Sequence, residues 1–257
     1  MESHRPAPSD RLREIYERRA ELQYAAPRPL PDPSVDRKFE RVCELVAEQM
    51  PCERYLDAGC GDGRYLAALA GLPARPRRVA ATDISERILS VACAAGAAAA
   101  IEVEAVRANV EALPFEDCSF DVVLCTQVIE HLLDPALGVG ELARVLSPGG
   151  RAIVTTDRRS AVTAALNLPR SIAVRLLGLR GRHVPVVWPE RTFSVEELAG
   201  LVRGAGLEVE RTETFRFTLQ PPLDWAPAVR LLNRLDRRLA PHGLGNLVAV
   251  IARKPSG

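Results

Sequence analysis

The chain of 257 residues is long enough for one sizeable α/β domain, and its 47% hydrophobic content can fill a core of that size. Its 34 Lys and Arg residues nearly balance its 33 Asp and Glu residues, so no overall field attracts nucleic acid or an anionic membrane. The six cysteines form no Cys-x-x-Cys pair, and we find neither a targeting segment nor an apolar run of membrane-spanning length. We therefore expect a cytoplasmic protein with reduced thiols.

The first 34 residues are rich in proline and charge, so we expect an arm or lid here rather than a domain. A short helix is predicted over Asp10–Tyr24, before a proline-rich stretch that cannot continue it. A second helix is predicted over Val35–Met50, where apolar residues recur with helical spacing until Pro51. The domain proper should run from residue 35 to residue 257.

Beyond this helix the pattern alternates as repeated βα units, which predicts a mostly parallel sheet with helices on both faces. The expected strands are Arg54–Ala58, Arg78–Thr82, Ile101–Arg107, Asp121–Cys125 and Arg151–Thr155. The expected helices are Arg64–Ala70, Ser85–Ala95, Pro135–Leu146 and Ser194–Ala205, the last with a capping box from Ser194 and Glu197. Two more strands, Leu207–Phe217 and Asn246–Ala252, lack an ordinary crossover helix between them. The predicted fold is a Rossmann-like, doubly wound, seven-stranded sheet whose last strand is antiparallel.

Two segments, at about residues 158–190 and 218–245, are too long to be plain connections. Both combine aliphatic residues with arginines in an amphipathic style, so we expect a helical insertion over the active site. Three interpretations stay open: packing helices, a roof over a hydrophobic acceptor, and a surface that rests on a membrane. Aromatic candidates to line an acceptor pocket are Trp188, Phe193, Phe215 and Trp225, and candidates to close over a bound ligand are Tyr16 and Tyr24.

The segment Leu56–Gly63 reads LDAGCGDG and joins a predicted strand to a predicted helix. Ligands of open α/β sheets bind at this edge, and glycines let the backbone approach a ligand closely. A nicotinamide dinucleotide site would need a glycine where this chain has Arg64. Asp57, two positions before the first glycine, would repel a pyrophosphate and attract an ammonium group. The motif therefore favours a cofactor that carries a cationic amino acid.

This segment resembles motif I of the class I S-adenosylmethionine-dependent methyltransferases. The resemblance continues through AVRANVEALPFEDCSFDVVLCTQVIEHLLDP and LSPGG and covers about residues 35–157. It is strongest to the small-molecule methyltransferases of ubiquinone and menaquinone biosynthesis. It implies S-adenosyl-L-methionine as the cofactor and S-adenosyl-L-homocysteine as the product. The cofactor-binding residues that it implies are Asp57, Gly59, Cys60, Gly61, Gly63, Asp83, Ile84, Asn109, Val110, Thr126 and Gln127.

The resemblance also implies roles within this set. Asp83 ends the second predicted strand and should accept hydrogen bonds from the ribose hydroxyls, with Ile84 packing on adenine. Asn109 stands where the family commonly has an acid on the adenine amino group, so Val110 should bond through its backbone instead. Gln127 lies where the family's residue after the fourth strand meets the methionine part of the cofactor.

Methyl transfer is an in-line displacement that depends mainly on holding the nucleophile near the methyl group, so no strong catalytic motif is required. For a hydroxyl acceptor a general base helps, and His131, beside Glu130 just past the fourth predicted strand, is the best-placed candidate. His183 in the first insertion is a second candidate. The alternative for Glu130 and His131 is a structural role, in which they cap the adjoining helix or bond to the backbone. A metal site stays an alternative, because some relatives carry Glu-x-x-Glu-His as ligands. We expect no metal ion, since Gln127 replaces the first carboxylate of that pattern.

The sequence thus predicts methyl transfer to a small, rather hydrophobic metabolite, such as a quinone precursor, a lipid or a natural product. One alternative is an RNA methyltransferase, which the clustered arginines suggest and the near-zero net charge opposes. Another is a non-catalytic cofactor-binding partner of a second enzyme. The expected partner is a small-molecule acceptor rather than nucleic acid, and peripheral membrane contact stays open. The methylated atom and the oligomeric state are not predicted.

Overall fold

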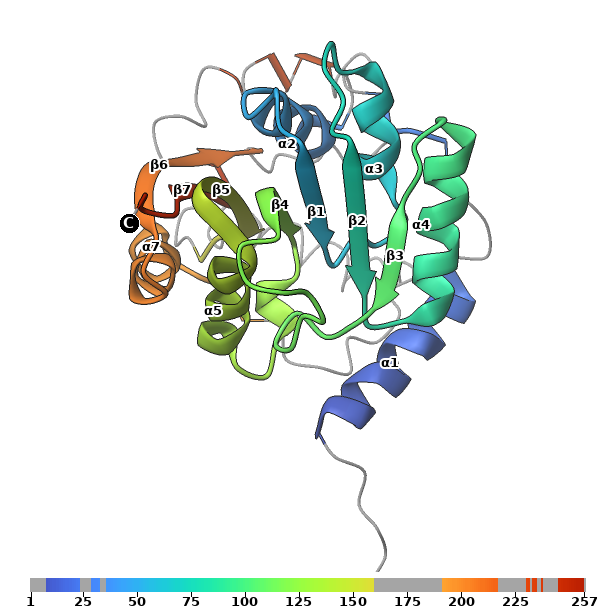
Figure 1. The fold of residues 1–257 in the computed structure, drawn as a ribbon, viewed down its shortest axis with the longest axis horizontal. Helices are drawn as coiled ribbons and strands as arrows, with labels where there is room; N and C mark the ends of the chain where they lie inside the picture. The colour runs from blue at the N-terminus through green and yellow to red at the C-terminus, as the bar shows by residue number, and fades with distance from the viewer. Residues whose placement is uncertain are drawn as a thin grey trace, which may run out of the picture.

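A computed structural model of the protein describes residues 8–23, 29–32, 36–159, 191–216, 230–231, 233–234, 237 and 245–256. Its centre is a seven-stranded sheet with the strand order β3-β2-β1-β4-β5-β7-β6 (Figure 1). Strands β1 to β5 pair in parallel, whereas β7 is antiparallel to both of its neighbours, β5 and β6. The predicted fold class is confirmed.

The strands are β1 Arg54–Ala58, β2 Arg78–Asp83, β3 Glu104–Arg107, β4 Phe120–Thr126, β5 Leu146–Asp157, β6 Glu208–Phe215 and β7 Leu247–Arg253. The α-helices are α1 Pro8–Gln23, α2 Arg37–Ala47, α3 Arg64–Ala68, α4 Glu86–Ala98, α5 Pro135–Val145 and α7 Val195–Gly204. Two short 3-10 turns are η1 Leu69–Gly71 and η2 Ile129–His131. Strand β3 starts later than predicted, because the N–H of Ile101 is bound to the carbonyl of Gly96 at the end of α4.

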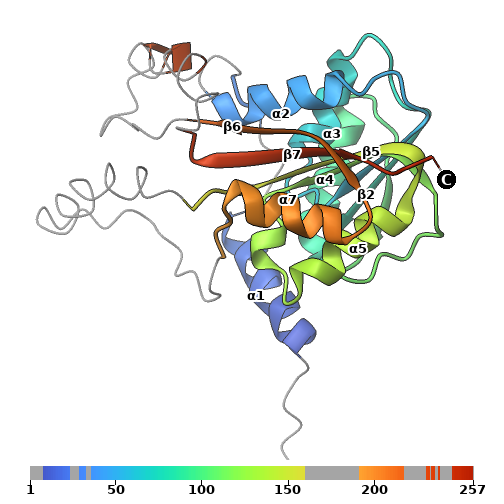
Figure 2. The ribbon, with the colours of Figure 1, turned by 90° about the vertical axis from the view of Figure 1, so that its left-hand side faces the viewer.

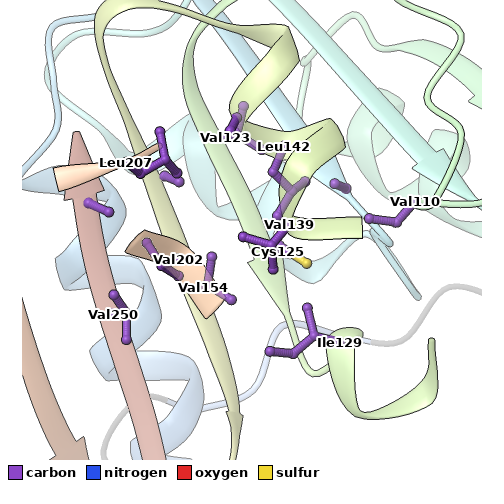
Figure 3. Close-up of a cluster of buried hydrophobic side chains, with 14 of the residues drawn as sticks. Val110, Val123, Cys125, Ile129, Val139, Leu142, Val154, Val202, Leu207 and Val250 are labelled. Carbon is purple, nitrogen blue, oxygen red and sulfur yellow. The ribbon is translucent and has the colours of Figure 1, made fainter. Parts of the chain in front are cut away.

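Helices cover both faces of the sheet, as the side view shows (Figure 2). Because successive strand residues face opposite ways, Tyr55 of β1 packs in one core cluster with α2, α3 and α4. Leu56 packs in the other cluster, which α5 and α7 complete (Figure 3). This burial on both faces explains the nearly continuous apolar runs of the central strands.

Side-chain caps fix where the helices begin. Ser85 caps α4 and Asp134 caps α5, each by accepting a hydrogen bond from a backbone N–H of the first turn. The predicted capping box of Ser194 and Glu197 is confirmed at α7. The caps therefore fix where these helices start after the strands. Because β1, β2 and β4 are parallel, their carboxyl ends lie at one edge of the sheet, where α1 also lies (Figure 1).

The structure describes two of the candidate pocket aromatics. Phe193 and Phe215 are 8% and 2% exposed and belong to the two core clusters. Phe193 also lines a cavity beside α5 and α7, together with Thr192 and Leu201. Both flank long connections, and the sequence alone does not distinguish a core aromatic from a pocket aromatic there.

Several other predictions concern parts of the chain that the structure does not describe. They are the bulk of both insertions and the residues Tyr24, His183, Trp188 and Trp225. Within the described ranges, no helix is both long and apolar enough to cross a bilayer.

Candidate functional site

A cavity of about 350 Å³ opens at the carboxyl edge of the sheet. Its walls come from the turns after β1, β2, β3 and β4, from α2, and from the N-terminal helix α1. Nine of the predicted cofactor residues line it: Gly59, Cys60, Gly61, Asp83, Ile84, Asn109, Val110, Thr126 and Gln127. Asp57 and Gly63 do not line it. The structure thus brings most of the predicted set to one place.

The glycine loop after β1 is held against the tip of β2. The N–H groups of Gly59 and Cys60 both donate to the carbonyl of Thr82, each at 2.8 Å. The three glycines have positive φ angles, which favour residues without a side chain. A Cβ atom on Gly61 would meet no protein atom within 4 Å, whereas one on Gly63 would lie 2.6 Å from the Cα of Ala92 in α4. Gly61 therefore keeps space in the cavity open, and Gly63 permits close packing.

Asp83 closes the second strand and is almost fully buried. Its carboxylate accepts hydrogen bonds from the N–H groups of Gly61 at 3.2 Å and Ser85 at 3.0 Å. Burial raises the pKa of Asp83 to about 6, although these N–H groups oppose the shift. At pH 7 the group is therefore mostly ionised, and it retains lone pairs for ligand hydroxyls in the cavity.

Asp57, in β1 before the glycine loop, is buried and does not line the cavity. Its side chain is 1% exposed, and neither of its oxygens has a hydrogen-bond partner among the described residues. Burial, followed by the charges of Asp83 and Asp62, raises the pKa of Asp57 to about 8. The structure therefore does not show Asp57 facing a ligand directly.

The turn after β3 carries Asn109 and Val110. The Asn109 side chain donates to the carboxylate of Glu111 at 2.8 Å and accepts from the Glu111 N–H at 3.1 Å. The acid that the resemblance leads one to expect at position 109 is thus replaced by an amide tied to an acid two residues later. Val110 is buried and contributes an apolar wall.

The turn after β4 also lines the cavity, through Gln127 and Val128. Gln127 has a positive φ angle of 55°, which is unusual for a residue with a side chain, and its backbone N–H donates to the carbonyl of Thr155 at 2.9 Å. The buried Nε2 atom of Gln127 has no partner among the described residues. An amide donor held this way favours a ligand that carries an acceptor atom.

Glu130 and His131 form η2 and both line the cavity. Glu130 is 2% exposed, and its Oε2 accepts a hydrogen bond from Thr156 at 2.8 Å. Burial raises the pKa of Glu130 to about 8. Burial, and then the charge of Arg19, lowers the pKa of His131 to about 4. The side chain that caps α5 is Asp134, so the helix-capping alternative is wrong. The Glu130 carboxyl does accept a hydrogen bond from its own backbone N–H, as the other alternative expects.

Helix α1 forms the outer wall of the cavity through Leu12, Tyr16 and Arg19, which share one helix face. The Tyr16 ring meets the His131 ring edge to face with centroids 5.8 Å apart. Glu17 anchors the helix on the amino end of α4, where its carboxylate accepts from the Ser85 hydroxyl at 2.9 Å and from the Glu86 N–H at 2.7 Å. The position of Tyr16 agrees with the lid predicted for the N-terminal arm.

Sequence reasoning missed several cavity residues, most notably Lys38 of α2. Burial, followed by the charge of Arg216, lowers the pKa of its ammonium group, and the charges of Asp36 and Asp157 oppose this shift. Asp157 at the end of β5 also lines the cavity. Lys38 precedes the buried Phe39 in α2, and its place in the sequence does not show that it lies at the carboxyl edge of the sheet. Only the packing of α2 shows this.

No group of three or more His, Cys, Asp or Glu side chains is arranged to hold a metal ion in the described ranges. The hydrogen-bond donors at the cavity include the amide of Gln127, the ammonium of Lys38 and the guanidinium groups of Arg19 and Arg64. This donor set suits an organic ligand with hydroxyl and carboxylate oxygens better than a bare cation.

Comparisons with known proteins agree with this geometry. Residues 56–154 match the family model described as a methyltransferase domain. The chain is 30% identical over 203 residues to a ubiquinone biosynthesis O-methyltransferase from Xylella fastidiosa, which covers 75% of each chain.

Solved structures also share the fold. A SAM-dependent methyltransferase from Thermotoga maritima superposes with a TM-score of 0.58 at 22% identity, covering 95% of this chain and 97% of that one. The cyclase SpnF gives 0.59 at 23% identity, covering 85% and 81%. At these identities the likeness concerns the fold alone. The sequence matches, with which the fold agrees, show that the chain belongs to the class I methyltransferases and uses S-adenosylmethionine as its methyl donor.

Proposed function

We propose that the protein transfers the methyl group of S-adenosylmethionine to a hydroxyl group of a small, hydrophobic metabolite, such as a quinone precursor. The observation that carries this proposal is a buried carboxyl group, Glu130, in the wall of the cofactor cavity. A hydroxyl acceptor must lose its proton to become an ether, and a carboxylate in the cavity wall can take that proton. The relatives named as ubiquinone biosynthesis O-methyltransferases support the same class of acceptor.

The cavity residues fit the cofactor. Asp83 would accept from the ribose hydroxyls, Ile84 and Val110 would enclose the adenine, and the open space over Gly61 would admit the ligand backbone. The unpaired Nε2 of Gln127 and the ammonium of Lys38 would hold the methionine part and its carboxylate. When bound, S-adenosylmethionine supplies an electrophilic methyl group on a positively charged sulfur.

Glu130 then acts as the general base. Its carboxylate would take the proton of the acceptor hydroxyl, and S-adenosylmethionine, when bound, would supply the methyl group to the acceptor oxygen and leave as S-adenosylhomocysteine. A base is most effective when its pKa lies near the working pH, and this criterion favours Glu130, at about 8, over His131, at about 4. His131, held by Tyr16, would instead shape the edge of the acceptor site.

The test uses three probe acceptors: catechol, an octyl-substituted catechol and octylamine. Release of S-adenosylhomocysteine should be fastest with the octyl-substituted catechol. Activity should rise with pH because Glu130 must be ionised. The midpoint of this rise, the rising limb of the pH profile, should lie near pH 8 in the free enzyme. It should lie at lower pH in the complex, because the positive sulfonium favours the ionised carboxylate.

Two variants identify the base. Glu130→Gln should abolish activity towards the catechols and keep the affinity for S-adenosylhomocysteine, whereas His131→Gln should keep the rising limb at its original pH. Preference for octylamine, or a rising limb that survives in Glu130→Gln, would show that the assignment is wrong. Neither an RNA substrate nor a non-catalytic role is favoured by the comparisons.

A further inference from the structure

Thr156 of β5 makes a buried contact with the proposed base. Its hydroxyl donates to the Oε2 of Glu130 at 2.8 Å, and the two residues are 26 positions apart in the sequence. Thr156 is 0% exposed and Glu130 is 2% exposed, so water does not compete for this bond. Glu130 lines the cavity and Thr156 does not, so Thr156 reaches a ligand only through Glu130.

Groups from several elements also affect the ionisation of the Glu130 carboxyl. Asp157 of β5 disfavours its ionised form and Lys38 of α2 favours it, as does the backbone N–H of Glu130 itself. Cys125 of β4 is buried nearby, and His131 follows in η2. Among the described residues, Thr156 is the side chain that donates a hydrogen bond to this carboxyl.

We propose that Thr156 is a positioning residue, whose hydroxyl fixes the Glu130 carboxyl and sets the pH at which the acceptor is deprotonated. This inference rests on the proposed role of Glu130. With Oε2 held by Thr156, Oε1 is the atom that takes the acceptor proton. A hydrogen bond to an ionised acceptor is stronger than one to a neutral acceptor, so the hydroxyl favours the carboxylate over the acid.

Thr156→Val removes the hydroxyl and keeps the shape of the side chain, whereas Thr156→Ser keeps the hydroxyl. The pKa of Glu130 can be read without any acceptor by NMR of the full-length protein with carbon-13 in the glutamate carboxyl groups. The Glu130 signal is assigned by its loss in Glu130→Gln. Thr156→Val should raise that pKa by on the order of one unit, and Thr156→Ser should restore it, because the lost bond is one to a charged group.

The chain offers a matched control one residue away. Thr155 is equally buried, but its hydroxyl pairs with the Thr126 hydroxyl at 2.8 Å instead of with Glu130. Thr155→Val should therefore leave the Glu130 titration in place. If Thr156→Val fails to fold, Thr156→Ala removes the same hydroxyl from a smaller side chain.

The activity limb with the octyl-substituted catechol should move to higher pH in Thr156→Val, with about a tenfold loss of kcat below the limb for a shift of one unit. An unmoved Glu130 titration in Thr156→Val, or an equal shift in Thr156→Ser, would overturn the inference. A shifted titration together with an activity limb that persists in Glu130→Gln would instead refute Glu130 as the base, so the two failures are distinguishable.

Discussion

Two glycines of the loop after β1 have different functions, and alanine substitutions separate them. Gly61 and Gly63 both have positive φ angles, 54° and 75°. A methyl group on Gly61 would point into space with no protein atom within 4 Å, in a residue that lines the cavity. On Gly63 it would lie 2.6 Å from the Cα and 2.8 Å from the carbonyl oxygen of Ala92. Gly61→Ala should therefore impair cofactor binding, and Gly63→Ala should impair folding.

The magnitudes follow from backbone strain and packing. Left-handed backbone in a residue with a Cβ costs about 1–2 kcal/mol in either variant. Gly63→Ala adds about 1–3 kcal/mol of overpacking against backbone that cannot move aside easily. At roughly 2–4 °C per kcal/mol, the Tm should fall by about 3–6 °C for Gly61→Ala and by on the order of 10 °C for Gly63→Ala.

Thermal unfolding and calorimetric titration with S-adenosylhomocysteine measure the two effects. Gly61→Ala should raise the Kd by at least about tenfold, since overpacking a bound ligand by one methyl group has a similar energy to overpacking a core. Gly63→Ala should keep nearly the parent Kd at a temperature where it is folded. Parent affinity in Gly61→Ala, or equal Tm losses in the two variants, would refute the reasoning.

Two further variants test the walls of the cavity. Glu17→Gln removes the negative charge that α1 places against Ser85 and Glu86 at the amino end of α4. Because such a cap is worth about 1 kcal/mol, we expect S-adenosylhomocysteine to bind about fivefold more weakly and α1 to be cleaved faster by a protease. Lys38→Gln should weaken the binding of S-adenosylhomocysteine by about tenfold in the same calorimetric assay. The affinity for methylthioadenosine, which lacks the amino acid, should not change. Equal losses of affinity for both ligands would show that Lys38 does not hold the amino-acid part.

The fold was predictable because its signals are local. Each βα unit carries its own alternation of apolar strand and capped helix, and Ser194 with Glu197 marks the start of α7 within four residues. The antiparallel end of the sheet followed from the missing crossover helix before β7. The boundaries of β3 and β5 were less predictable, because they depend on partners in other elements, such as the Gly96 carbonyl that holds Ile101.

The site was predictable where chain order brings residues together. Residues at the carboxyl ends of β1, β2 and β4 must meet at one edge of a parallel sheet, so Gly61, Asp83 and Gln127 were found from sequence. Lys38 and Thr156 were not found, because their roles depend on how α2 and β5 pack rather than on any motif. Neither residue type is unusual at its position, so the roles proposed for them rest on contacts that the sequence does not show.

Asp57 shows how far an electrostatic argument from sequence can place a charge. The sequence predicts that its carboxylate attracts a cation, and in the structure the side chain is buried, has no hydrogen-bond partner among the described residues and does not line the cavity. Asp57 lies in β1, Asp62 in the loop after it and Asp83 at the end of β2, and the charges of Asp83 and Asp62 raise the pKa of Asp57 beyond what burial alone does. A positive charge entering the cavity relieves this repulsion for all three at once. The preference for a cationic cofactor therefore belongs to the acidic cluster as a whole, with Asp62 and Asp83 at the cavity wall and Asp57 behind it.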